Sequence, residues 1–185
     1  FEEGETGWTI TGNRVVADAA GAHTATQGTK MMVLNPGQVT PNAVLAQTFA
    51  TTVGKTYTVS LDVGIIGSIN VQQRLRVVIT GASELVNQLE TLTALSTSNT
   101  AATWFPKSYT FVANSTSTIL GLADQSTSGS SRDLLLDNVR CAIRIQRSLT
   151  VNSTPDTGLA ITVSPNDVNA AGNGTTGFTR TYDHG

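Results

Sequence analysis

Four polar residues in two strand-like segments carry side chains suited to binding a sugar. They are Asp62, Gln72, Arg74 and Arg76. A guanidinium fork or a carboxylate can make paired hydrogen bonds to neighbouring hydroxyls, and the fork can also bind the carboxylate of a uronate. If the two segments pair as neighbours in one sheet, these side chains share a face and form a ligand-binding surface. The alternative is a solvated face with ordinary cross-strand ion pairs, and the residues alone leave both interpretations open.

The two tryptophans and the polar pair Asp124 and Gln125 are further candidates for ligand binding. Sugar recognition ordinarily uses an aromatic ring as a platform for the apolar face of the sugar, and aromatic residues make up only 5% of the chain. Trp8 and Trp104 are the candidate platforms, although both lie in segments where tryptophan more often belongs to a core. Asp124 and Gln125 precede a Ser- and Gly-rich segment, and we expect them to line the edge of that loop.

Carboxylates mark both ends of the strand-rich part of the chain. Glu2 belongs to the opening Phe1-Glu2-Glu3-Gly4, and Asp137 belongs to the closing Leu134-Leu135-Leu136-Asp137-Asn138-Val139. Calcium prefers oxygen ligands at flexible distances. Two such carboxylates near the first and last strands of a sandwich can therefore tie its ends together through a metal ion.

The residue types needed for catalysis are sparse and scattered. A Ser–His nucleophile needs a histidine held by a third group, and the chain has only His23 and His184, neither in a recognisable motif. Two distant histidines and the lone Cys141 are a poor zinc set. No glutamate apart from Glu2 lies at a convincing strand end for a glycosidase pair. We therefore expect a binding protein and not an enzyme.

Composition narrows the classes of partner. Charged residues make up 13% of the 185 residues, the net charge is −2, and Lys and Arg are scattered, so we expect no nucleic-acid partner. No stretch approaches the roughly 20 apolar residues that span a bilayer, so we expect no membrane partner. The single Cys141 excludes an internal disulfide and, in an alternating segment, is expected to be buried. Few Lys and Cys with many Thr, Ser and Asn suit a bacterial secreted or cell-surface protein.

Period-two alternation recurs along the chain and predicts strands. In 56–63 the residues Tyr57, Val59, Leu61 and Val63 form one face, and in 73–79 the arginines point away from Leu75, Val77 and Ile79. Further strands are expected at 14–17, 30–34, 44–49, 107–113 and 117–123, and 83–95 favours a strand over a short helix. Tyr57, Tyr109 and Phe111 are expected in the core. The pattern predicts an all-β antiparallel sandwich joined by Gly-, Pro- and Asn-rich turns.

The character of the chain changes near residue 147. Residues 1–146 are enough for one sandwich domain with its own core. Residues 147–185 hold short strand-like runs around a Gly- and Asn-rich loop and are too few for a free-standing core. We interpret 147–185 as the start of a second β-module, cut off or completed by another chain. The alternative is a C-terminal strand extension that leans on the first domain.

The order and spacing of several motifs resemble a known group of modules. The motifs are Phe1-Glu2-x-Gly4-x-x-x-Trp8, Gly28-Thr29-Lys30, Gln47-Thr48-Phe49, Gly54-Lys55-Thr56-Tyr57, Trp104-x-x-x-Ser108-Tyr109-x-Phe111 and Leu136-Asp137-Asn138-Val139. Over roughly residues 1–145 the chain resembles the galactose-binding-like jelly-roll carbohydrate-binding modules of bacterial glycoside hydrolases and cell-wall proteins. Each motif alone is commonplace; their combination is more specific for the fold than for the ligand.

The resemblance implies a fold, a function and a metal. It implies a jelly-roll sandwich that binds a polysaccharide or oligosaccharide without catalysis, as part of a larger secreted protein. Carried over residue by residue, it also implies a structural calcium ion held by Glu2, Thr29 and Asp137. The alternative function is a structural or adhesive surface domain that self-associates through its C-terminal strands without sugar specificity.

Overall fold

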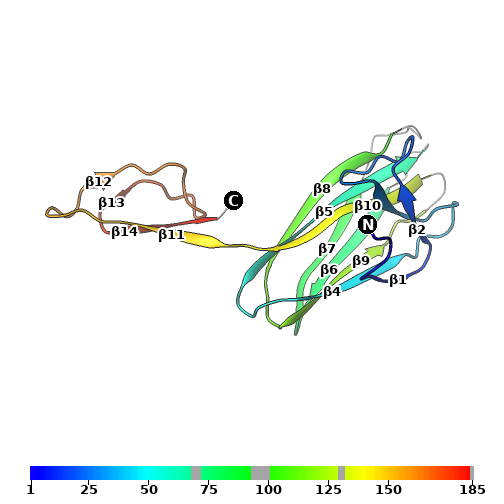
Figure 1. Ribbon diagram of the computed structural model, residues 1–185, viewed down its shortest axis with the longest axis horizontal. Helices are drawn as coiled ribbons and strands as arrows, with labels where there is room; N and C mark the ends of the chain where they lie inside the picture. The colour runs from blue at the N-terminus through cyan, green and yellow to red at the C-terminus, as the bar shows by residue number, and fades with distance from the viewer. Residues whose placement is uncertain (68–71, 93–100, 129–131, 184–185) are drawn as a thin grey trace. The chain divides into compact units, whose positions relative to one another are not determined.

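The computed structural model describes residues 1–67, 72–92, 101–128 and 132–183, and every regular element in these ranges is a β-strand (Figure 1). A helix with the length and apolar character to cross a membrane is not found in these ranges. The chain forms two compact units, Phe1–Ala142 and Ile143–Gly185. The predicted division after residue 146 lies a few residues beyond this boundary.

Unit 1 (Phe1–Ala142) is a sandwich of two five-stranded sheets. Sheet A has the order β1-β4-β9-β6-β7, with bounds Thr9–Thr11, Val44–Ala50, Ser117–Asp124, Gln73–Thr80 and Glu84–Leu92. Sheet B has the order β2-β3-β10-β5-β8, with bounds Arg14–Asp18, Lys30–Leu34, Arg132–Ile143, Thr56–Gly67 and Thr103–Val112. The chain crosses repeatedly from one sheet to the other, as in a jelly roll. The predicted all-β antiparallel sandwich is confirmed.

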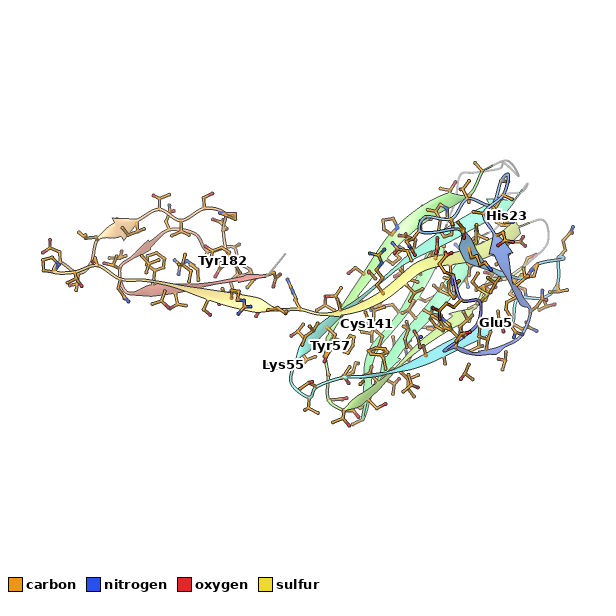
Figure 2. All side chains as sticks on the ribbon, in the orientation of Figure 1. Glu5, His23, Lys55, Tyr57, Cys141 and Tyr182 are labelled. Atoms are coloured by element: carbon orange, nitrogen blue, oxygen red, sulfur yellow. The ribbon has the colours of Figure 1, made fainter. Side chains whose placement is uncertain are left out.

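The core of unit 1 forms where the inward faces of the two sheets meet. In β5 and β6 alternate residues are buried, so Val59, Leu61, Leu75 and Val77 are almost fully excluded from solvent. Tyr57 points into the same space (Figure 2) and its ring stacks on that of Phe111, 5.7 Å between centroids. The predicted inward register of these strands and of the three core aromatics is confirmed, because period-two alternation fixes which face of a strand is apolar.

A second, smaller apolar cluster lies on the outward face of sheet B. Met31, Val33, Ile66 and Leu135 are buried there against Trp104 and four alanines, one in β2 and three in the segments that precede β3 and β8. Since a sheet face cannot be buried without a cover, residues 19–29 between β2 and β3 act as that cover. We call residues 19–29 the cover loop.

Unit 2 (Ile143–Gly185) is built from two short antiparallel pairs. β11 (Gln146–Val151) pairs with β14 (Phe178–Asp183), and β12 (Ala160–Ile161) pairs with β13 (Gly174–Thr175). Phe178 lies against Gly174, where a side chain would collide with its ring, and Arg180 lies 4.4 Å from the Phe178 ring centroid. No described residue of unit 2 reaches the burial of the sandwich core.

Candidate functional site

The candidate site residues form two groups, which lie on opposite faces of the sandwich. The outward face of sheet B carries carboxylates that hold the cover loop, and the outward face of sheet A carries the arginines of β6. The expected cluster of Asp62 with Gln72, Arg74 and Arg76 is wrong, because β5 and β6 belong to different sheets. Alternation gives the exposed face of each strand, but it does not tell which sheet a strand joins after a crossover.

Glu2 holds the C-terminal end of the cover loop. Its carboxylate accepts hydrogen bonds from the Lys30 N–H (3.0 Å), the Thr29 N–H (3.0 Å) and the Thr29 hydroxyl (2.9 Å). The backbone bond from Lys30, followed by the hydroxyl of Thr29, lowers the pKa of Glu2. Gly28 has a φ of +66°, and any Cβ there would collide with the Glu2 carboxylate. The loop can therefore close on this carboxylate only with glycine at 28.

Asp137 and Asp62 hold the middle of the same loop. The buried Asp137 Oδ2 accepts bonds from the N–H groups of Thr26 (2.7 Å) and Gln27 (3.0 Å), and Oδ1 accepts from Asn138 N–H (2.6 Å). The Thr26 hydroxyl lies 2.6 Å from Asp62 Oδ2 and 3.1 Å from Asp137 Oδ2, so it joins the two carboxylates. Glu2, near the start of the sandwich sequence, and Asp137, near its end, thus bind the same loop.

The side chains around the cover loop offer the type of ligand atom that a hard cation binds. Glu2 and Thr29 touch directly, and Asp137 binds the same loop two and three residues earlier. All the side-chain atoms they offer are oxygens, and Asn138 Oδ1 nearby is buried without a hydrogen-bond partner, which matches calcium chemistry. A group of three or more His, Cys, Asp or Glu is not found among the described residues, so backbone carbonyls would have to complete the set.

Neither tryptophan offers an open platform. The Trp104 ring lies over Gly64, where a Cβ would collide with it, and its indole N–H donates to the Thr24 carbonyl of the cover loop (2.9 Å). Trp8 is half-buried against the main core, with its ring 5.5 Å from that of Phe1. Trp104 is therefore part of the small cluster on sheet B and is bonded to the cover loop.

Asp124 is also not available at the surface. It is 6% exposed and points inward from β9, where it accepts hydrogen bonds from the Asn35 side chain and from the Ser126 N–H (2.9 Å). Burial raises the pKa of this carboxyl, against the opposing effect of these bonds. The expectation that Asp124 lines a loop edge is wrong, because the inward register of β9 continues to its last residue.

The outward face of sheet A brings the β6 arginines beside a strip of short side chains. The registers place Arg76 beside Ala123 of β9 and Leu89 of β7, and the next row places Val78 beside Gly121 and Asn87. Across β9, Gly121 faces Ala46 of β4. The strip formed by Ala46, Gly121 and Ala123 carries no side chain longer than a methyl group, so it leaves the sheet open alongside the arginines.

The arginines are held by neutral groups. Arg76 donates from Nη1 to Asn87 Oδ1 (2.8 Å) and from Nε to Gln125 Oε1 (3.4 Å), and Arg74 donates from Nε to Gln72 Oε1 (2.8 Å). The structure thus brings Gln72, Arg74 and Arg76 together, as predicted for these three, and adds Gln125. Asn87 was missed, although its place on the outward face of β7 follows from the same alternation.

The described residues considered for catalysis, His23 and Cys141, lie on different elements. His23 belongs to the cover loop and Cys141 lies near the end of β10 (Figure 2), while His184 is outside the described residues. Cys141 is exposed, so the prediction of burial is wrong: β10 runs beyond the core, and its residues are exposed from Arg140 onward. Partial desolvation still raises the pKa of the thiol, which keeps it protonated at neutral pH.

Comparison with known proteins shows the fold of the sandwich. No family model and no curated protein matches the sequence. Among solved structures, the K1 cleaved adhesin domain of Lys-gingipain from Porphyromonas gingivalis matches with a TM-score of 0.55 and 15% identity, over 76% of this chain and 94% of that one. The K3 domain matches with a TM-score of 0.55 and 14% identity, over 76% and 93%.

A carbohydrate-binding module is also among the structural neighbours. The second family 16 carbohydrate binding module matches with a TM-score of 0.45 and 17% identity, over 76% of this chain and 94% of that one. At this TM-score the likeness does not identify a ligand for this chain. The adhesin domains confirm the predicted type of β-sandwich, and their low identity leaves the ligand to be argued from the residues of this chain.

Proposed function

We propose that this chain is a non-catalytic carbohydrate-binding module whose binding surface is the outward face of sheet A. The observation that carries the proposal is the placing of Arg74 and Arg76, with Asn87 and Gln125, beside the open strip of Ala46, Gly121 and Ala123. Planar amides and guanidinium groups can donate paired hydrogen bonds to the hydroxyls of a sugar. The strip supplies a surface along which an extended polymer can lie.

The two faces of the sandwich differ in what they can offer a ligand. On sheet B the cover loop occupies the outward face and engages Trp104. On sheet A the side chains of the arginines are only half-buried, and the neighbouring positions on β9, Gly121 and Ala123, are small. With both tryptophans engaged elsewhere, binding would rest on hydrogen bonds more than on stacking, so a modest affinity is expected.

Such a module would act by holding an attached domain near a polysaccharide. Tethering raises the effective concentration of that domain at its target without any new contact. This role suits a secreted or cell-surface protein, and the solved domains that share the fold are named cleaved adhesin domains.

A blocking variant tests the surface. Ala46→Ile places a branched side chain on the strip, and Ser108→Ile places the same side chain on the outward face of sheet B as a matched control. Affinity electrophoresis through a panel of polysaccharides should show retardation of the native chain and of Ser108→Ile by the same glycan, and its loss in Ala46→Ile. Equal retardation of both variants would contradict this surface, and no retardation by any glycan would contradict the function.

Calcium is proposed as a structural ion for the cover loop. Glu2, Thr29 and Asp137 would hold it, with the support that two carboxylates converge on one loop and that Asn138 Oδ1 has no partner. The ion would supply positive charge next to a buried carboxylate. The melting temperature should be higher in calcium than in EDTA, and Asp137→Asn should abolish this difference. The same melting temperature in calcium, magnesium and EDTA would contradict a calcium site.

A second candidate function is favoured by the strands of unit 2. Within the described residues β11 pairs only with β14, so its other edge offers unpaired backbone groups, and Leu149 on this strand is 43% exposed. Exposed edges of this kind invite pairing with another chain. An adhesive domain that self-associates would show a mass that rises with concentration in light scattering, together with no glycan binding. A constant monomer mass would contradict it.

A further inference from the structure

We propose that the surface on sheet A selects acidic polysaccharides, whose uronate carboxylates bind between Arg74 and Arg76. This inference rests on the proposed function and names the class of ligand for the same surface. It follows from the charge and hydrogen-bonding state of the two arginines.

The two arginines bring positive charge that no neighbouring acid neutralises. They are two residues apart on one face of β6, and none of the ion pairs of the described residues involves either of them. Along the side-chain hydrogen bonds of the two arginines, the first acid is Glu84, which reaches Arg76 only through Asn87. Arginine pairs most strongly with carboxylates in a two-bond fork, so this surface lacks the partner that its groups fit best.

The geometry leaves both Nη atoms of Arg74 and the Nη2 atom of Arg76 available for a ligand. In Arg74 the one side-chain bond uses Nε, and in Arg76 the bonds use Nε and Nη1. The neutral partners Gln72, Gln125 and Asn87 hold the stems in place without cancelling their charge. A side chain that is positioned in this way loses less freedom when it binds a ligand.

The opposite face has the reverse charge. Asp62 and Asp137 lie at the cover loop on the outward side of sheet B, and Asp133 precedes the outward-facing Leu135 by two residues. The net charge of the chain is −2, so the arginine pair is a local positive patch on a slightly acidic protein. An acidic polymer would therefore be attracted to sheet A in preference to sheet B.

The test compares one polymer in two charge states. Affinity electrophoresis in calcium-free buffer would use polygalacturonate and the same polymer after chemical reduction of its carboxyl groups. The native chain should bind polygalacturonate at least about tenfold more tightly than the reduced polymer, the range expected for hydrogen bonds to a charged group. The preference should fall as salt is raised.

Three variants locate the effect. The double variant that combines Arg74→Gln with Arg76→Gln should bind polygalacturonate about tenfold or more weakly than the native chain. The control is a double variant, Arg140→Gln with Arg147→Gln, at two exposed arginines outside this surface. It makes the same change in net charge and should bind like the native chain. Arg74→Lys with Arg76→Lys keeps the charge but removes the forks, and should fall between the two.

Each other outcome overturns a defined part of the inference. Equal binding to both polymers would overturn acidic selectivity while the proposed function stands. Equal loss in the two Arg→Gln pairs, or binding as tight to polyglutamate as to polygalacturonate, would show general charge attraction in place of a glycan site. If the chain binds neither polymer but binds a neutral glycan of the panel, acidic polysaccharides are excluded as the ligand class and the proposed function stands.

Discussion

The two units of this chain are stabilised in different ways. In unit 1 the sheets enclose a core in which Leu61, Leu136 and their neighbours are almost fully buried. In unit 2 no described residue reaches that burial, and Leu149 and Leu159 keep more than two-fifths of their surface exposed. Burial of apolar side chains therefore stabilises unit 1, whereas unit 2 depends on hydrogen bonds within its loops.

Asp167 is the centre of the hydrogen bonding in unit 2. Its carboxylate accepts bonds from the N–H groups of Asn169 (2.8 Å), Ala171 (2.9 Å) and Thr181 (3.1 Å), and these bonds lower its pKa. One side chain thus connects a loop to β14. A strand pair too small for a core can therefore still adopt a defined shape when a carboxylate satisfies several backbone donors.

The greatest loss of stability is expected when a leucine of unit 1 is truncated, with a leucine of unit 2 as the comparison. Leu136→Ala should lower the free energy of unfolding of unit 1 by about 3 kcal/mol, because it removes a fully buried side chain from a packed core. Leu149→Ala should change stability by less than about 0.5 kcal/mol, because the side chain is 43% exposed. Urea unfolding of the two variants measures both. Similar losses would contradict the absence of a core in unit 2.

A smaller effect concerns Asp133 in β10. Burial raises the pKa of Asp133 to about 6, so the native state favours the protonated carboxyl. Its contribution to stability is greatest below about pH 4, the unfolded value, and is lost as the pH rises through about 6. Since the side chain is partly exposed, Asp133→Asn should add only about 1 kcal/mol at pH 7. Denaturant midpoints of both proteins at pH 4 and 7 should differ only at pH 7.

The smallest global effect is expected from Asp167→Ala. Hydrogen exchange should speed up at the amides of Asn169, Ala171 and Thr181, while the amides of the β5 and β6 core stay protected. Because the pKa of Asp167 is lowered, its contribution is complete at neutral pH and is lost as the pH falls below about 4. The native chain at low pH should therefore show the same local exchange, and protection unchanged by acid would contradict this role.

The sequence predicted the faces of strands better than their neighbours. Alternation in 56–63 and 73–79 identified the buried residues, because a one-residue shift would expose the whole apolar set. Sheet membership depends on crossovers that alternation does not record, so Asp62 was placed beside Arg74 when it lies on the other sheet. The exposure of Cys141 was missed because alternation in β10 continues beyond the end of the core.

Contacts between distant polar residues were predicted only in part. The resemblance of the motifs indicated that Glu2, Thr29 and Asp137 belong together, and the structure shows Glu2 bonded to Thr29 and Asp137 bonded to Gln27 of the same loop. Nothing in the spacing indicated that Lys107 pairs with Glu90 at 2.6 Å or that Tyr109 donates to the same carboxylate at 2.9 Å. Burial raises the pKa of Glu90, but these two bonds outweigh it and leave the pKa lowered.

The contact between Trp104 and the cover loop gives the chain an optical reporter. The indole N–H bonds to a carbonyl of the loop, and the ring lies over Gly64. Detachment of the loop would bring water to the indole, and its emission would shift to longer wavelength before the sandwich unfolds. The fluorescence of a chain with Trp8→Phe would then follow the docking of residues 19–29 without any added label, in a titration with chelator or acid.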